Sequence, residues 1–106
     1  MGRFVIVAYK PKAGMEQALA AVVAKHLQVL RTENLVTDQS ALVMRAADGT
    51  IVEVFEWLSA EAIAKAHASP AVNALWAEFG AACDYVPLAT LAESKQMFAE
   101  FESVTT

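Results

Sequence analysis

Hydrophobic residues change their spacing along the chain, and each change predicts where one element ends and the next begins. Residues 3–10 are rich in β-branched and aromatic side chains and stop at a break that holds Pro11 and Gly14, which predicts a strand followed by a turn. Over residues 15–33 the apolar positions recur every three or four residues, which predicts a helix with one buried face. This face carries Met15, Leu19, Val22, Val23, His26, Val29 and Leu30.

A β-hairpin is predicted after this helix. Residues 40–46 and 50–58 are both typical of strands, and Asp48-Gly49 between them is a strong hairpin signal, because these residue types tolerate the backbone angles of a tight turn.

Two helices should follow the hairpin. Ser59 can cap a short helix over residues 60–67. Ser69 then provides a second cap and Pro70 the first helical position, where a proline is favoured. The apolar stripe of this last helix consists of Val72, Leu75, Trp76 and Phe79. Trp76, at its centre, is therefore expected to be mostly buried.

The end of the chain is predicted to form a strand and a terminal helix. Residues 83–89 are typical of a strand, and Pro87 marks it as an edge or bulged strand. Residues 90–93 fit a capping box, and the helix that they would start places three apolar residues together. These residues are Met97, Phe98 and Phe101.

The predicted order of elements is strand, helix, two strands, broken helix and strand, followed by the extra helix. Right-handed crossovers fold this order into a ferredoxin-like βαββαβ arrangement, with a four-stranded antiparallel sheet and both helices on one face. Residues 1–106 are therefore expected to form a single α+β domain.

Both faces of the predicted strands are apolar. In the first strand Phe4, Ile6 and Ala8 alternate with Val5, Val7 and Tyr9. A sheet that is apolar on both sides has to be covered on both sides, and the helices cover only one. We therefore expect a homodimer in which a second copy of the chain covers the other face.

Composition and charge narrow the class of protein. The net charge of −4 comes without the basic stripe that nucleic-acid binding requires, so no nucleic-acid partner is expected. The mean hydropathy of +0.38 is high, but the longest strongly apolar runs are too short to span a bilayer, so no membrane partner is expected. No signal peptide is apparent, and a cytoplasmic protein is expected. With Cys83 as the single cysteine, a disulfide framework and a thiolate metal cage are both excluded.

The two histidines are the only side chains that titrate near neutral pH without help from their surroundings. His26, near the middle of a helix's apolar face, could be a general base over a pocket between helix and sheet, or a core histidine bonded to a backbone carbonyl. His67 could line the same pocket, or satisfy carbonyls where the helix breaks.

Residues 55–62, followed by Ala66-His67-Ala68-Ser69-Pro70, resemble the antibiotic biosynthesis monooxygenase family. Members of this family end the third strand with a Trp, then a Ser, and carry a His just before a Ser-Pro or Thr-Pro helix start. The element order matches over about residues 3–90. The resemblance implies a dimeric α/β barrel, in which two ferredoxin-like sheets pack face to face. It does not extend to the haem-degrading branch, which uses an Asn on the first strand that this chain lacks.

The resemblance implies a monooxygenase that needs no metal or flavin and acts on a small aromatic or quinol-like substrate. His67 or His26 would act as the base. The walls of the pocket for this small apolar molecule would come from Trp57, Trp76, Phe79 and Tyr9. Arg45 could hold an anionic substrate or form a salt bridge in the dimer. A non-catalytic ligand-binding or regulatory barrel protein is the alternative, because it needs only the pocket.

Overall fold

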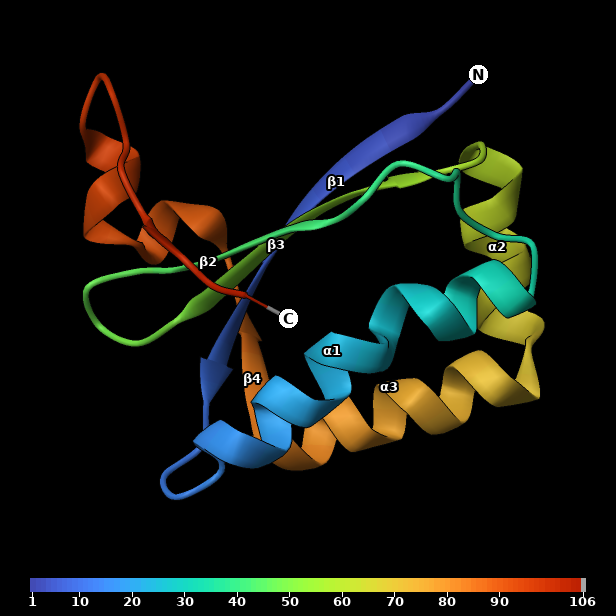
Figure 1. The fold of residues 1–106 in the computed structure, drawn as a ribbon, viewed down its shortest axis with the longest axis horizontal. Helices are drawn as coiled ribbons and strands as arrows, with labels where there is room; N and C mark the ends of the chain where they lie inside the picture. The colour runs from blue at the N-terminus through green and yellow to red at the C-terminus, as the bar shows by residue number, and fades with distance from the viewer. Residues whose placement is uncertain (106) are drawn as a thin grey trace.

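The computed structural model describes residues 1–105 of the chain. Figure 1 shows the order of the elements along it. They are β1 (Arg3–Pro11), α1 (Glu16–Thr32), β2 (Leu42–Arg45), β3 (Ile51–Trp57), α2 (Ala60–Ala68), α3 (Pro70–Ala82), β4 (Cys83–Val86), the short 3-10 helices η1 (Leu88–Thr90) and η2 (Ala92–Lys95), and β5 (Glu102–Ser103).

The strands form one antiparallel sheet in the order β4-β1-β3-β2-β5. The first four strands of this order are compatible with a ferredoxin-like fold, which confirms the α+β prediction. Over the described residues the sheet has five strands rather than the predicted four, because β5 pairs with the outer edge of β2. The central strands β1 and β3 pair from Arg3↔Trp57 to Tyr9↔Ile51, whereas β4 reaches only residues 8–11 of β1.

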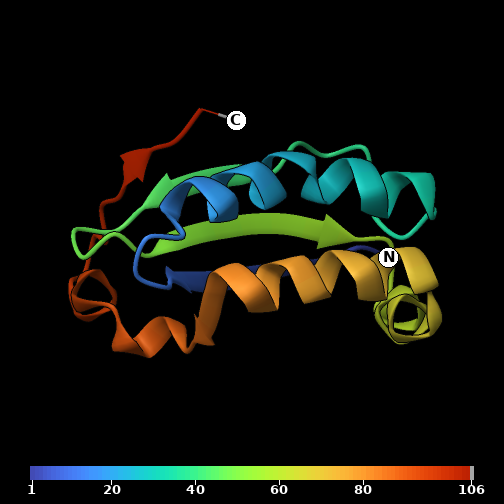
Figure 2. The same ribbon diagram turned by 90° about the horizontal axis from the view of Figure 1, so that it is seen from below.

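Helices α1 and α3 lie side by side on one face of the sheet, with α2 at the beginning of α3 (Figure 2). The predicted starts of α2 and α3 are confirmed by side-chain hydrogen bonds. The Ser59 side chain accepts a hydrogen bond from the Ala62 N–H, and Ser69 accepts one from the Val72 N–H, with Pro70 directly after it. These local signals set where the helices begin.

The protein core lies between the helices and the inward-facing residues of β1 and β3. Tyr9, Phe55 and Trp57 point into it, and they meet buried leucines and phenylalanine from α1 and α3. On the opposite face of the sheet, three apolar side chains are more than half exposed. These are Phe4, Ile6 and Leu42. The two-sided apolar pattern therefore leaves one apolar face uncovered in the protomer.

The predicted terminal helix is wrong, and β4 ends at Val86 instead of continuing to residue 89. Only the short turns η1 and η2 form, because the residues of the expected capping box bond elsewhere. The Glu93 carboxylate accepts the Ala47 N–H of the β2–β3 hairpin, and the Thr90 hydroxyl donates to the Pro87 carbonyl. Leu91 is buried against the sheet face opposite the helices, on which this segment lies in Figure 1.

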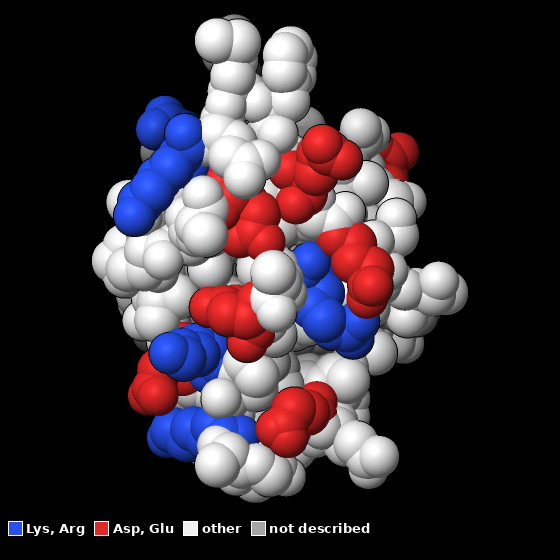
Figure 3. All heavy atoms as spheres, turned by 90° about the vertical axis from the view of Figure 1, so that its left-hand side faces the viewer, with Lys and Arg blue, Asp and Glu red and all other residues white. Residues whose placement is uncertain are grey.

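Met97 and Phe98 were expected to pack with Phe101 on the terminal helix, but they are 93% and 81% exposed. Phe101 alone packs against the cluster around Leu91. Figure 3 shows the side of the molecule that holds this segment and the hairpin. Acidic and basic side chains are interspersed there, so the basic residues do not gather into one patch on this face.

Candidate functional site

An apolar pocket of about 350 Å³ lies between the sheet and the helices α2 and α3. The sheet contributes Val5, Val7, Tyr9, Phe55, Trp57 and Tyr85 to its walls. The helices contribute His26, Ile63, His67, Trp76 and Phe79. Because β4 is short and pairs only with the end of β1, it does not flank Val5 and Val7. The exposed residues His67 and Tyr85 mark where the pocket reaches the surface.

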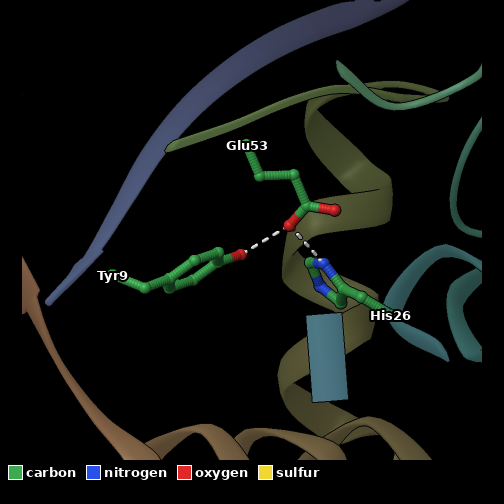
Figure 4. Close-up of polar contacts among 3 residues, drawn as sticks. All are labelled: Tyr9, His26 and Glu53. Carbon is green, nitrogen blue, oxygen red and sulfur yellow. Dashed lines mark hydrogen bonds and ion pairs between the residues drawn. The ribbon is translucent and has the colours of Figure 1, made fainter. Parts of the chain in front are cut away.

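Three buried polar side chains meet beside this pocket (Figure 4). The Tyr9 hydroxyl donates to Oε1 of Glu53 at 2.6 Å, and Nδ1 of His26 lies 2.7 Å from the same oxygen. Tyr9 comes from β1, Glu53 from β3 and His26 from α1, and their exposed fractions are 1%, 1% and 3%. A carboxylate is costly to bury, and these two hydrogen bonds offset that cost.

The hydrogen bonds define which atoms carry protons. Burial, reinforced by the neighbouring Glu53, raises the pKa of Tyr9 well above its usual value, so the phenol keeps its proton and donates it. When Glu53 is ionised its carboxylate can only accept, and His26 then donates to Oε1 from Nδ1. The lone pair of a neutral His26 ring is then on Nε2.

The second nitrogen of His26 is accessible. Over residues 1–105, Nε2 of His26 has no hydrogen-bond partner. It is nevertheless not a fully buried atom without a partner, because in this part of the chain that description fits Thr50 Oγ1. Nε2 is therefore in contact with the open space of the pocket that His26 lines. Figure 4 shows this nitrogen on the side of the ring away from the bond to Glu53.

Aromatic rings hold the imidazole in this orientation. Phe55 and Phe79 each meet the His26 ring edge to face, with centroids 5.0 Å apart. Phe79 also stacks on Tyr9 at 4.7 Å. Such contacts restrict rotation of the ring, so the position of Nε2 is fixed before any ligand binds.

His67 lies at the mouth of the pocket, where its ring is 4.9 Å from that of Trp76. Its backbone carbonyl at the helix break accepts a hydrogen bond from the Asn73 side chain. Trp76 is mostly buried, as expected, although part of the indole stays exposed. One side of the indole packs on the core, and another forms a wall of the pocket.

Most of the residues singled out in the sequence line this one pocket, and Arg45 does not. Arg45 lies on β2 and forms an ion pair with Glu102 of β5 at 2.7 Å. Sequence reasoning missed the role of Glu53, which joins Tyr9 to His26. A signal was present, because Glu53 is in phase with Phe55 and Trp57, so an acid had to point toward the core.

Within residues 1–105, no group of three or more histidine, cysteine or acidic side chains is placed to hold a metal ion. In the same part of the chain, every helix is too short or too polar to cross a bilayer. Comparisons of the chain with protein-family models, with curated proteins and with solved structures give no match.

Proposed function

We propose that the protein is a monooxygenase of the antibiotic biosynthesis type, which binds a small hydroxylated aromatic or quinol-like molecule and needs no bound cofactor. The observation that supports this proposal is the position of His26. Its Nε2 borders an apolar pocket, while its Nδ1 is held by the buried carboxylate of Glu53. A base fixed in this way can remove a proton from a bound hydroxyl group.

The reaction begins when Nε2 of His26 takes the hydroxyl proton of the substrate. The resulting phenolate delocalises its charge onto a ring carbon, and this electron-rich carbon is the one that reacts with O2. One oxygen atom stays on the carbon as a carbonyl group. The other leaves as water with two hydrogens of the substrate, one from the hydroxyl group and one from the carbon.

Glu53 and Tyr9 support the base. When His26 gains a proton, the ring becomes an imidazolium, and the carboxylate 2.7 Å from Nδ1 stabilises this charge. Tyr9 donates to the same oxygen and keeps it in place. Positioning of this kind contributes to the rate because the base is already oriented when it takes the substrate proton.

The walls of the pocket select a flat apolar molecule. Trp57, Trp76 and Phe79 offer aromatic surface, and the described residues that line the pocket include no lysine, arginine or acid. A ligand with a net charge would lose its hydration there without a charged partner. His67 at the mouth is placed to meet a second polar atom of the ligand, such as the other oxygen of a quinol.

We also propose that two copies pack their sheets face to face as a dimeric α/β barrel. The exposed side chains of Phe4, Ile6 and Leu42 on the uncovered sheet face support this assembly. Contiguous apolar surface of this kind is unusual on a monomeric protein and is typical of an interface.

Oxygen uptake on a panel of quinols and hydroxylated polycyclic aromatics tests the function. The wild type should consume oxygen with one or more of these compounds. His26→Gln should lower the turnover about 10²- to 10⁴-fold, the usual contribution of a general base. His67→Gln is the matched control, because it changes the other histidine of the pocket and should act mainly on KM.

Ligand binding, followed through the fluorescence of Trp57 and Trp76, shows whether each variant retains its pocket. Compounds that bind to the wild type without any oxygen consumption would contradict the proposal. They would favour the ligand-binding protein instead.

A further inference from the structure

The carboxylate of Glu53 lies between two cavities. Through Oε1 it is bonded to Tyr9 and His26, which line the pocket described above. Glu53 itself lines a second cavity of about 210 Å³, located between α1 and the segment that leads into β2. We call this second space the rear cavity. It lies on the opposite flank of α1 from the pocket.

The rear cavity is polar and open to solvent. Gln28 and Arg31 of α1 and Ser40 before β2 form part of its lining, and all three are exposed residues. Their amide, guanidinium and hydroxyl groups can hydrogen-bond to water. The pocket, in contrast, is lined almost entirely by apolar and aromatic side chains.

The second oxygen of Glu53 has no hydrogen-bond partner in the described residues. Within the described residues, both partners of the carboxylate bond to Oε1, and none bonds to Oε2. In the described residues the fully buried side-chain atom without a partner is Thr50 Oγ1, and Oε2 of Glu53 is not such an atom. Figure 4 shows Oε2 directed away from Tyr9. The carboxylate therefore has one oxygen bonded to the histidine and one left without a partner in the described residues, and Glu53 lines the rear cavity.

We propose that Glu53 carries protons between His26 and solvent through the rear cavity. This inference deepens the proposed function and rests on His26 being the base of that reaction. A ligand that fills the apolar pocket excludes water from Nε2, so His26 then has no direct contact with solvent. Glu53 provides a route that stays open while the pocket is occupied.

The proton moves in three steps. Nε2 of His26 receives the hydroxyl proton of the ligand, and the proton on Nδ1 passes to Oε1 of Glu53. Half a turn of the carboxyl group about its Cγ–Cδ bond then brings the protonated oxygen into the rear cavity. Water there accepts the proton, and Glu53 returns to its ionised form.

The return path restores the starting state. Glu53 takes a proton from the rear cavity and gives it back to Nδ1. The imidazolium formed in this way delivers its Nε2 proton to the oxygen that leaves the product as water. One proton leaves and one enters through Glu53 in each cycle, so the relay adds no net proton to the reaction.

The exchange of the Nδ1 proton of His26 with water, measured by NMR on protein with ¹⁵N-labelled histidine, tests the relay without any substrate. Val7→Phe places a ring in the pocket and closes the direct route to His26. Exchange at Nδ1 should continue in this variant. Should Val7→Phe not fold, Ile63→Phe closes the same pocket from α2.

Ala24→Leu then blocks the rear cavity, which Ala24 lines from the exposed surface of α1. In the Val7→Phe background it should slow the exchange about tenfold or more, because both routes are closed. Ala21→Leu is the matched control, since Ala21 is exposed on the same helix and lines a different cavity. Equal exchange rates in the Ala24→Leu and Ala21→Leu variants would overturn the relay.

The NMR exchange measurement tests the relay independently of the oxygen-uptake assay. If no compound of the panel supports oxygen uptake, the exchange measurement still decides whether Glu53 connects His26 to the rear cavity. If a substrate is found, Ala24→Leu should lower kcat about tenfold and leave KM unchanged, because the pocket that binds the substrate is intact. A change confined to KM would contradict the relay.

Discussion

Replacement of Tyr9 by phenylalanine removes one buried oxygen atom and tests the protonation state of the whole cluster. The hydroxyl donates to a buried carboxylate at 2.6 Å, and hydrogen bonds to charged groups contribute about 1.5–3 kcal/mol to stability. The ring itself can stay stacked on Phe79. At pH 8 we therefore expect Tyr9→Phe to lower the free energy of unfolding by about 1.5–3 kcal/mol.

The same variant should change how stability depends on alkaline pH. Burial, reinforced by Glu53, raises the pKa of Tyr9 in the folded protein, whereas the unfolded chain ionises this phenol near its ordinary value of 10.0. Below that value both states hold the proton, and the stabilisation is fully present. Above it, unfolding releases a proton, so wild-type stability falls by about 1.4 kcal/mol per pH unit for this group.

Phenylalanine cannot ionise, so Tyr9→Phe loses this slope. The gap in unfolding free energy between wild type and variant should shrink by about 1 kcal/mol between pH 10 and pH 11, because the unfolded phenol is already half ionised at pH 10. Burial also raises the pKa of Tyr85, to about 12, but Tyr85 is present in both proteins and its effect cancels. Urea unfolding at one fixed protein concentration, followed by tryptophan fluorescence, measures both free energies. A gap that stays constant from pH 8 to pH 11 would refute the proton assignment in the cluster.

Two further predictions concern assembly and packing. Sedimentation of the wild type should give a mass twice that of the 11.4 kDa chain. The Leu42→Glu variant should sediment as a monomer, because it places a charge on the proposed interface. A monomeric wild type would contradict the dimeric barrel. Phe79→Ala should lower the free energy of unfolding by about 3–5 kcal/mol, since Phe79 is fully buried. Trp76→Ala should cost less than half of that amount because one side of the indole faces the open pocket, and equal losses would show that this space is filled core.

The parts of the fold that the sequence predicts correctly depend on local interactions. The Ser69-Pro70 helix start and the Asp48-Gly49 turn are determined by residues that bond to their own neighbours, as the Asp48 side chain does to the Thr50 N–H. The predicted terminal helix has the same kind of signal and fails. Glu93 bonds to the distant Ala47 instead, a tertiary contact that no local pattern contains.

The candidate site was predictable only in part, for a similar reason. Helix periodicity places His26 on the inner face of α1, and strand alternation places Tyr9 on the inner face of β1. That these side chains meet at Glu53 depends on the register of β1 against β3 and on the position of α1 above them. Strand register and helix placement arise from packing of the whole domain. The sequence pattern therefore identifies Tyr9 and His26 as inward-facing residues but does not show that both bond to Glu53.

The short strand β5 has a consequence for how the sheet ends. The outer edge of β2 would otherwise present free backbone groups beside Leu42, Val43 and Met44, an apolar stretch that favours pairing with strands of other chains. Residues 102 and 103 pair with Arg45 and Met44 at one end of this edge, and the Arg45 guanidinium donates a hydrogen bond to the Glu102 carboxylate. A strand of two residues is too short to offer the next chain a template of its own. The pairing of β5 thus shortens the free edge of the sheet to which a strand of another chain could add.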